Sequence, residues 1–445
     1  MTKDPRDILN NEPMKARQVL IVGLCLLLNA LDGFDILAIT FAAPGIAQDW
    51  AVGPEMIGIV ISTGLFSMAV GSILLSPITD KVGRRFMVIA CLLVMGVGML
   101  LSAFATDIIS LCVYRFITGL GIGGILPTIN AVSAEFSNEK RRHFSVCMMG
   151  IGYAIGGVLG GSAAAFLLSI YSWESVFIFG GVMAFIILPI AWFLMPESIE
   201  FLIARKGQGA LEQTNKILRQ LGHSEADHIR MAEAGTKPAG LSLLFTPRNL
   251  PQTVALSVSY FLHVMTLYYV LGWVPTLVTG LGFDKVVGTD VSVWVNIGGM
   301  FGGILFGWAA TYYDLRKLLV GILLTGGVLV ILFGQVPADL VLLKSVGFLV
   351  GFCMSGSVIG LYALLAAIYP TTLRATGTGF VVGAGRAGSA IGPVITGFLL
   401  AAGATRGETS MIMAMGSIIA GLVLLSPWIN RRPVPEMAHK PQPGQ

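Results

Sequence analysis

The stretch SPITDKVGRR (residues 76–85) lies between two long apolar runs, near Met56–Ile78 and Phe86–Thr106. It places one acid among three bases in a compact turn at Gly83. An apolar run of about 20 residues is long enough to cross a bilayer, so the charged turn connects two expected membrane spans. Basic residues concentrate in cytoplasmic loops, and the turn is therefore expected on the cytoplasmic side.

The composition of the whole chain agrees with this interpretation. The 445 residues are 55% hydrophobic and only 12% charged, and the mean hydropathy is +0.81. Soluble domains carry roughly 25% charged residues. These figures exclude disordered, collagen-like, disulfide-scaffold and nucleic-acid-binding proteins. The 5 cysteines fall inside apolar runs without metal-ligand spacing, so no metal site is expected.

Apolar runs of sufficient length recur along the chain and predict an all-α integral membrane protein with twelve transmembrane helices. The expected spans lie near Val19–Ala43, Met56–Ile78, Phe86–Thr106, Ile108–Ala131, Phe144–Ser169, Ser175–Met195, Thr253–Thr276, Val291–Tyr312, Leu318–Gln335, Val341–Ala367, Thr376–Ala402 and Met411–Ile429. They form two six-helix halves, residues 19–195 and 253–429, joined by a central loop at 196–252. Residues 1–18 and 430–445 are tails, and the loop contains an expected amphipathic helix near Leu211–Leu221.

The distribution of basic residues predicts the orientation. Nearly all of the 28 Lys and Arg residues fall in the tails, the central loop and the loops on the side of residues 76–85. Lys285 and Arg406 fall in loops on the opposite side, and Arg115, Lys344 and Arg386 fall within spans. Both termini and the central loop are therefore expected in the cytoplasm.

The two halves repeat one another at a nearly constant offset. Five residues of the first half recur 231 or 232 positions later: Gly71 as Gly302, Arg85 as Arg316, Arg142 as Arg374, Gly156 as Gly388 and Gly160 as Gly392. The position that corresponds to Asp80 is Thr311. Two halves that run in the same direction are parallel repeats, an arrangement typical of transporters with a site between the halves.

Two acids in the first span are the main candidates for coupling chemistry. Asp32 and Asp35 are three residues apart and lie on one helix face. Charges inside a membrane are costly, and such residues usually face a cavity and have a function there. Because the two carboxylates are packed together and partly dehydrated, one of them is expected to bind a proton more readily than a free aspartate, as proton coupling requires. The alternative is that both only pair with an arginine and hold helices together.

Two arginines inside spans are candidates for the partner of these acids or of a substrate. Arg115 begins the fourth span, and Arg386 lies in the middle of the eleventh. A guanidinium stays charged in a protein and binds carboxylates with two parallel hydrogen bonds. Either arginine can therefore hold an anionic substrate, or form a permanent ion pair with an aspartate that never contacts the substrate.

Residues 76–85 also supply a candidate cytoplasmic gate. An acid among bases at the mouth of the bundle suits ion pairs that break when the cytoplasmic side opens, although topology alone also explains basic loop residues. The loops after the fourth and tenth spans extend this set. The expected gate residues are Asp80, Lys81, Arg84, Arg85, Glu135, Arg142 and Arg374.

Aromatic and polar residues near the middle of the membrane are candidates for the lining of a substrate pocket, because a planar ring can stack on them. They are Phe34, Tyr268, Tyr269, Trp273 and Asn296. His263 lies inside a span without a second ligand nearby in sequence, so it is interpreted as a hydrogen-bonded core residue.

Taken together, these features resemble the major facilitator superfamily over nearly the whole chain. Residues 76–85 are similar to its motif Gly-x-x-x-Asp-Arg/Lys-x-Gly-Arg-Arg/Lys, except that Ser76 replaces the first glycine, which affects how the second and third helices pack. The resemblance implies the major facilitator fold and a monomer.

Within that superfamily, residues 32–35 (DGFD) resemble the first-helix signature of aromatic acid:proton symporters such as 4-hydroxybenzoate and benzoate permeases. Arg115, Glu135, the run YPTTLRATG (residues 369–377) and Gly385–Arg386 are also similar. The resemblance implies that Asp32 and Asp35 are essential, that Asp80 lies in a gating loop, and that both arginines serve binding or conformational coupling.

The predicted function is import of a hydroxybenzoate- or benzoate-like acid with protons across a bacterial inner membrane by alternating access. The alternatives are a symporter of sialate, muconate or a dicarboxylate, or an efflux antiporter. Gly156-Gly157 stands where drug antiporters usually carry Gly-Pro, which disfavours efflux. The sequence contains no catalytic or nucleotide-binding motif, so no enzyme activity is expected and no cofactor other than the proton as coupling ion. The expected partners are the acid, protons and the lipid bilayer.

Overall fold

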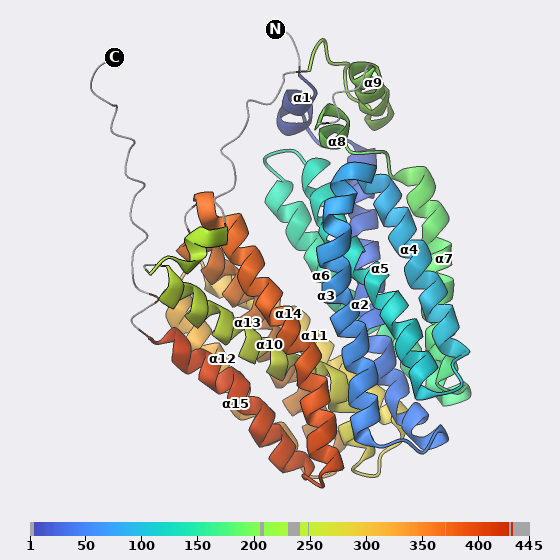
Figure 1. Cartoon of the computed structure of the whole chain (residues 1–445), viewed down its shortest axis with the longest axis vertical. Helices are drawn as coiled ribbons and strands as arrows, with labels where there is room; N and C mark the ends of the chain where they lie inside the picture. Colours follow the sequence, from blue (N-terminus) through green and yellow to red (C-terminus); the bar gives the residue numbers. More distant parts are fainter. Residues whose placement is uncertain are drawn as a thin grey trace.

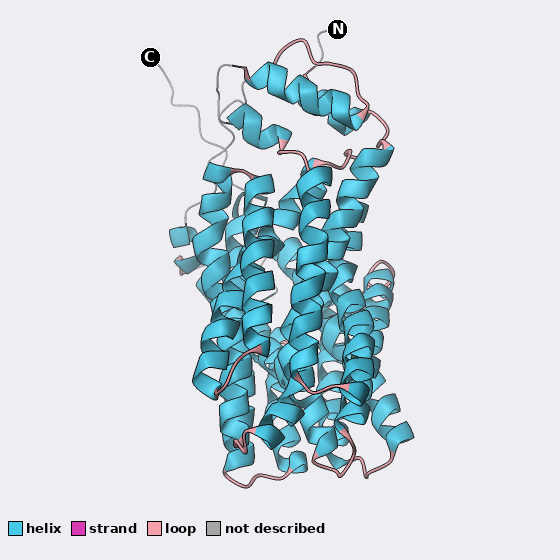
Figure 2. Cartoon of the chain, turned by 90° about the vertical axis from the view of Figure 1, so that its right-hand side faces the viewer, coloured by secondary structure: helices cyan, strands magenta, loops and turns pink. Residues whose placement is uncertain are grey.

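The computed structural model describes residues 4–204, 209–229, 241–247, 249–369, 371–426 and 429. Helices are the regular structure throughout these ranges (Figure 2), and 12 of them are long and apolar enough to cross a membrane. This follows from the solvent, because in lipid a helix satisfies every backbone N–H and C=O within its own segment.

The long helices form two bundles of six that lean against each other (Figure 1). The N-terminal half consists of α2 (Ala16–Asp49), α3 (Pro54–Val82), α4 (Arg84–Ala103), α5 (Ile108–Glu135), α6 (Arg142–Ile170) and α7 (Glu174–Leu194). The C-terminal half consists of α10 (Leu250–Thr279), α11 (Lys285–Ala309), α12 (Leu315–Gln335), α13 (Leu340–Ile368), α14 (Thr371–Ala401) and α15 (Arg406–Leu424). The short elements are α1 (Pro5–Asn11), α8 (Ile199–Ala204), α9 (Ala210–Leu221) and η1 (Leu241–Phe245).

The sequence repeat is a repeat of helix packing. Helix α2 packs on α6 as α10 packs on α14. A side chain at Gly156 of α6 would collide with the backbone carbonyl of Ala30, and one at Gly388 of α14 with that of Phe261. These close approaches explain the conserved spacing of glycines between the halves, since small residues let membrane helices pack tightly.

Equivalent arginines also make equivalent hydrogen bonds in the two halves. Arg85 Nη2 donates to the main-chain oxygen of Trp192 at 2.7 Å, and Arg316 Nε donates to that of Leu424 at 2.7 Å. Each arginine thus ties the start of the third helix of its half to the end of the sixth. The second half keeps this anchor although Thr311 replaces the acid Asp80.

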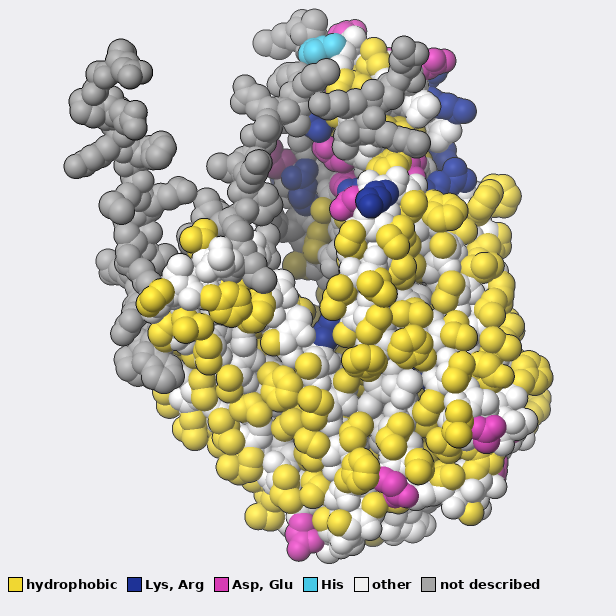
Figure 3. Space-filling view, viewed as in Figure 1, with side chains coloured by type: hydrophobic (Ala, Val, Ile, Leu, Met, Phe, Trp, Pro, Cys, Tyr) yellow, Lys and Arg dark blue, Asp and Glu magenta, His cyan; other side chains and the backbone are white. Residues whose placement is uncertain are grey.

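The halves touch closely at one end of the molecule. Gly58 of α3 lies against the backbone of Pro393 in α14, and Gly397 of α14 lies against Pro54. Toward the other end of α14, no heavy atom lies within 4 Å of where a Cβ of Gly379 or Gly383 would be. Figure 3 shows the surface hollowed between the halves at the end where the basic side chains gather. The structure is therefore open on that side and closed on the other.

Three predicted spans begin five or six residues too late in the sequence. Val291–Tyr312 is observed as α11, which begins at Lys285, Thr376–Ala402 as α14, which begins at Thr371, and Met411–Ile429 as α15, which begins at Arg406. Counting apolar residues missed the charged first turns of these helices. The start of α15 is instead marked by Thr405, whose hydroxyl accepts a hydrogen bond from the Glu408 amide at 3.2 Å.

Helix α5 has a similar polar start. Asp107 accepts hydrogen bonds from the amides of Ile109 at 2.8 Å and Ser110 at 2.9 Å. These bonds, that from Ser110 foremost, lower the pKa of the Asp107 carboxyl. Asp107 is an N-cap that satisfies amides with no partner inside the helix.

The N-terminal tail and the central stretch pack together on the N-terminal half (Figure 1). Arg6 of α1 pairs with Glu200 of α8 at 2.8 Å. The ring nitrogens of His223 lie 2.7 Å from Glu12 Oε2 and 2.8 Å from Gln18 Oε1. The predicted amphipathic helix is observed as α9, and these contacts attach it to one half instead of leaving it as a loose linker.

We expect Gly156→Ala to destabilise the protein by about 1–3 kcal/mol, because the new methyl group would force α2 and α6 apart. Gly150→Ala is the matched control on the same helix, since no atom lies within 4 Å of a Cβ there. The control should be neutral or slightly stabilising, as alanine favours helix. Thermal unfolding in detergent measures both variants, and equal midpoints for the two would contradict this packing.

Candidate functional site

Asp32 and Asp35 lie on α2 inside the bundle, with relative exposures of 1% and 0%. No described residue donates a hydrogen bond to either carboxylate. A buried charge without such partners is costly, so the surroundings of each carboxylate determine what it can do. Although the two residues are three positions apart on one helix, they have different neighbours.

Asp35 faces the interior of the N-terminal half. Its carboxylate lies beside Gly180 of α7, and Arg115 Nη2 donates to its main-chain oxygen at 2.8 Å. Arg115 is 2% exposed, and its guanidinium lies 5.8 Å from the ring centre of Phe177. Arg115 therefore bridges α2, α5 and α7 within a single half.

Asp32 faces the other half. Its carboxylate interacts electrostatically with Arg386 of α14 and with Tyr153 of α6 and Tyr268 of α10. Arg386 is half-buried and forms no ion pair with a described acidic residue. The cluster of Asp32, Tyr153, Tyr268 and Arg386, here called the central cluster, thus combines an acid from one half with a cation from the other.

Further tyrosines extend the central cluster within the C-terminal half. The rings of Tyr260 and Tyr362 pack edge to face, with centres 5.8 Å apart. Gly385 leaves room for the Tyr260 ring, which interacts with the neighbouring Arg386. The sequence analysis missed Tyr153, Tyr260 and Tyr362. Tyr153 and Tyr260 lie away from the ends of their spans, where membrane tyrosines usually gather, and this position was an available signal. Tyr362 lies near the end of α13 and offered no such signal.

The structure places the remaining pocket candidates in different environments. Phe34 packs edge-on against a phenylalanine of α7 inside the N-terminal half. The hydroxyl groups of Tyr269 and Ser410 lie 2.6 Å apart within the C-terminal half, and Trp273 is fully buried. Asn296 lies on the seam between the halves, beside Gly157. Of the five predicted lining residues, Tyr268 is the one in the central cluster.

The gate candidates form a network at the open end of the N-terminal half. Arg84 pairs with Asp80 at 3.2 Å and with Glu135 at 3.4 Å. Glu197 Oε1 accepts from the amides of Arg84 at 2.8 Å and Arg85 at 3.3 Å. Glu197 was not among the predicted gate residues, and it acts as an acidic cap at the start of α4.

The other gate candidates are less closely linked. Arg142 Nη2 donates to Asn10 Oδ1 of the N-terminal tail at 2.5 Å, and Asp80 is 73% exposed. Lys81 is exposed, and Arg374 lies in the first turn of α14, with its side chain outside the described set. The ion pairs of the described gate residues all join elements of the N-terminal half.

The arrangement suits the binding of an anion between two moving bodies. The central cluster supplies a cation and the Tyr268 ring from the C-terminal half, and a carboxylate and the Tyr153 ring from the N-terminal half. In the part of the chain that the structure describes, no three His, Cys, Asp or Glu side chains are grouped to hold a metal ion.

Comparison with known proteins agrees with this architecture. The family model described as Major Facilitator Superfamily matches residues 25–308 and 256–445. A gallate transporter of Pseudomonas putida is 31% identical, covering 95% of this chain and 94% of the relative. The 4-hydroxybenzoate transporter PcaK of Acinetobacter baylyi is 30% identical, covering 89% and 88%.

Solved structures are similar in fold at lower identity. The inward open conformation of the xylose transporter XylE from E. coli superposes with a TM-score of 0.71 at 16% identity, covering 92% of this chain and 95% of that one. The relatives are transporters, and no comparison suggests an enzyme. This chain belongs to the Major Facilitator Superfamily and is a membrane transporter.

Proposed function

We propose that this transporter imports an aromatic carboxylate together with protons across a bacterial inner membrane. The observation that carries the proposal is the central cluster, in which the charge of Arg386 acts on Asp32 across the boundary between the halves. The names of the relatives, which transport gallate and 4-hydroxybenzoate, support the substrate class. Tyrosines beside Arg386 support an aromatic substrate over a small aliphatic acid.

The proposed orientation has both termini and the hollow in the cytoplasm. The predominance of Lys and Arg on the side of the chain ends supports it. Figure 3 shows basic side chains near that end, whereas the charges visible at the opposite end are acidic. The structure then corresponds to an inward-facing state of an alternating-access cycle.

In the proposed mechanism, the substrate carboxylate binds Arg386 and neutralises its charge. Two parallel hydrogen bonds from a guanidinium to a carboxylate are strong and directional. Asp32 then takes up a proton, because it is buried and the positive charge that favoured its ionised form is now neutralised by the substrate. The loaded site carries the same net charge as the empty one, so both can move between the two sides of the membrane.

Asp35 and Arg115 have a different role in this proposal. Arg115 holds the main chain of α2 at Asp35 and lies inside the N-terminal half. The pair therefore positions the coupling helix instead of contacting the substrate. On the cytoplasmic side, the exposed Asp80 and Lys81 are available to meet the other half when the hollow closes.

Replacement of Asp32 by asparagine is expected to abolish proton-driven accumulation but to leave substrate exchange. One proton per monoanion allows about 10-fold accumulation for a gradient of one pH unit. In proteoliposomes, Asp32→Asn should therefore accumulate no substrate above equilibrium while still exchanging labelled for unlabelled substrate. Glu55→Gln, a neutralisation in the first turn of α3 away from the cluster, is the control. Accumulation by Asp32→Asn at the level of the parent protein would refute its coupling role.

Replacement of Arg386 by glutamine is expected to raise the KM for uptake by about 10- to 100-fold, because a hydrogen bond to a charged group contributes roughly 1.5–3 kcal/mol. Arg386→Lys keeps the charge but loses the two parallel hydrogen bonds, so its KM should lie between that of the parent protein and that of Arg386→Gln. An unchanged KM in Arg386→Gln would exclude Arg386 as the carboxylate partner.

The substrate class is tested by uptake of a panel under an imposed inward proton gradient. The panel contains 4-hydroxybenzoate, benzoate, protocatechuate, gentisate, muconate and sialate, with a protonophore as control. We expect protonophore-sensitive accumulation of at least one aromatic acid. Accumulation of sialate or muconate alone would instead support the alternative of a symporter for other organic acids.

A further inference from the structure

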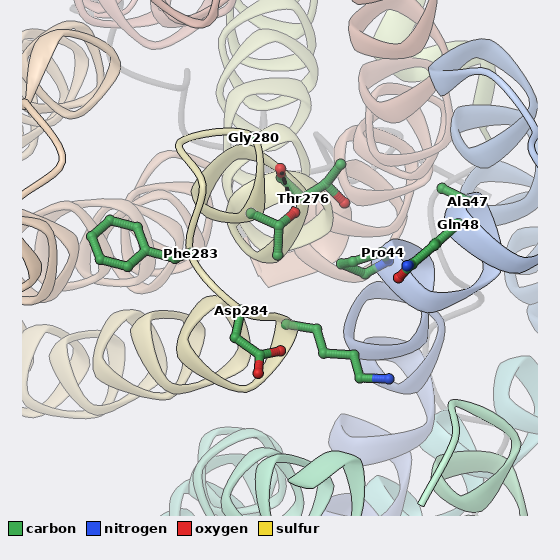
Figure 4. A pocket seen from close by; sticks show the side chains of 9 residues that line it. Pro44, Ala47, Gln48, Thr276, Gly280, Phe283 and Asp284 are labelled. Atoms are coloured by element: carbon green, nitrogen blue, oxygen red, sulfur yellow. Dashed lines mark hydrogen bonds between the residues drawn. The ribbon is translucent and has the colours of Figure 1, made fainter.

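A pocket separate from the central cluster lies at the closed end of the molecule, between the two halves (Figure 4). Its volume is about 470 Å³, and it is lined by the end of α2 from the N-terminal half and by the end of α10 and the following loop from the C-terminal half. Sites for small molecules in proteins typically have a few hundred cubic ångströms. The pocket is therefore large enough for a single-ring acid.

The surface around this pocket is acidic. The helix ends on this side carry the acids Asp49, Glu55, Asp107, Glu174, Asp284, Asp290, Asp339 and Glu408. Such a surface repels an anion that approaches from this side. An importer of carboxylates with this orientation therefore needs a positive charge on this side that offsets the repulsion.

Lys285 lines the pocket and supplies such a positive charge, beside Asp284 of the same lining. Three basic residues lie at this end, and two of them are engaged: Lys344 pairs with Asp290 at 2.5 Å, and Arg406 donates to the main-chain oxygen of Val336. The Lys285 ammonium forms no hydrogen bond or ion pair with another described residue. It is thus the cation at this end that remains available to an incoming carboxylate.

Neutral groups in the pocket add to the recognition of such a ligand. The hydroxyl of Thr276 is buried and has no hydrogen-bond partner, and it lines the pocket together with Gln48 and the ring of Phe283. Figure 4 shows Thr276 on α10 and Gln48 on α2, on opposite sides of the pocket. A buried hydroxyl without a partner is costly, and a ligand oxygen would satisfy it.

We propose that this pocket is an outer docking site, in which Lys285 and Thr276 hold the carboxylate of the substrate before the halves open toward the outside. The proposal rests on the function and orientation proposed above. Thr276 follows Tyr268 by eight residues on α10, which corresponds to about 12 Å along the helix axis. When the halves separate, the substrate moves along α10 from Lys285 to Arg386 and exchanges one cation for another.

The test measures initial uptake of 4-hydroxybenzoate into proteoliposomes in which the outer face of the transporter is exposed. At low ionic strength, Lys285→Gln should raise KM by about 3- to 10-fold with the maximal rate unchanged, and Lys285→Glu should raise it further. The effect should shrink at high salt, where exposed charges are screened. Lys285→Arg should retain the KM of the parent protein, and Thr276→Val should raise KM at all salt concentrations.

Lys344→Gln is the matched control, because it removes the same charge at the same end but outside the pocket. Its KM should stay within about 2-fold of the parent value, because a half-exposed ion pair contributes little. An equal rise in Lys344→Gln and Lys285→Gln would mean a general effect of surface charge and would overturn the docking site. An unchanged KM in Lys285→Glu and Thr276→Val would also overturn it while leaving the proposed function in place.

Failure of the proposed function gives a different result. If the parent protein takes up no aromatic acid while it transports another organic anion, the substrate class is wrong, and the same variants are then measured with that anion. A KM that rises in Lys285→Gln for that anion would keep the docking site. Should Lys285→Glu not fold, as judged by size-exclusion chromatography, Lys285→Gln and Thr276→Val carry the test.

Discussion

The proposed function depends on one electrostatic interaction, in which the charge of Arg386 acts on the Asp32 carboxylate across the boundary between the two halves. Both charges lie within membrane-spanning helices, where an unpaired charge is costly and electrostatic attraction is strong. Each half supplies one member of the pair, so any change in the charge of Asp32 alters how the halves attract each other. In the proposed cycle, a proton or a substrate carboxylate that enters between them therefore changes the attraction between the halves.

The two halves share one scaffold but differ in chemistry. The first-half positions of Asp32 and Asp35 correspond, 231 residues later, to His263 and Thr266. His263 lies within 2.8 Å of Ser417 Oγ and 3.0 Å of the Met354 main-chain oxygen, and both contacts stay inside the C-terminal half. Duplication thus conserved the packing while the acids remained in one half. The C-terminal half supplies the cation of the central cluster and the tyrosines Tyr260 and Tyr362 that extend it.

Much of this fold could be predicted from the sequence, because hydrophobic length and glycine spacing are local properties. The twelve spans and the repeat are examples, whereas the charged first turns of α11 and α15 misled a count of apolar residues. The candidate site was less predictable. Helical periodicity placed Asp32 and Asp35 on one face. The neighbouring helices nevertheless differ, so that Asp32 is influenced by Arg386 of the other half and Asp35 lies inside its own half. Tyr153 and Glu197 owe their positions to contacts between distant segments, which local patterns do not contain.

The most direct test of this account counts the protons that accompany substrate binding. Calorimetric titration of 4-hydroxybenzoate into the purified transporter, in two buffers of different ionisation enthalpy near pH 7, gives the number of protons taken up per bound molecule. The account predicts net uptake of about one proton, because the substrate carboxylate neutralises the charge of Arg386 that acts on the buried Asp32. Binding heats that do not depend on the buffer would show that no proton is taken up and would contradict the coupling of substrate binding to protonation of Asp32.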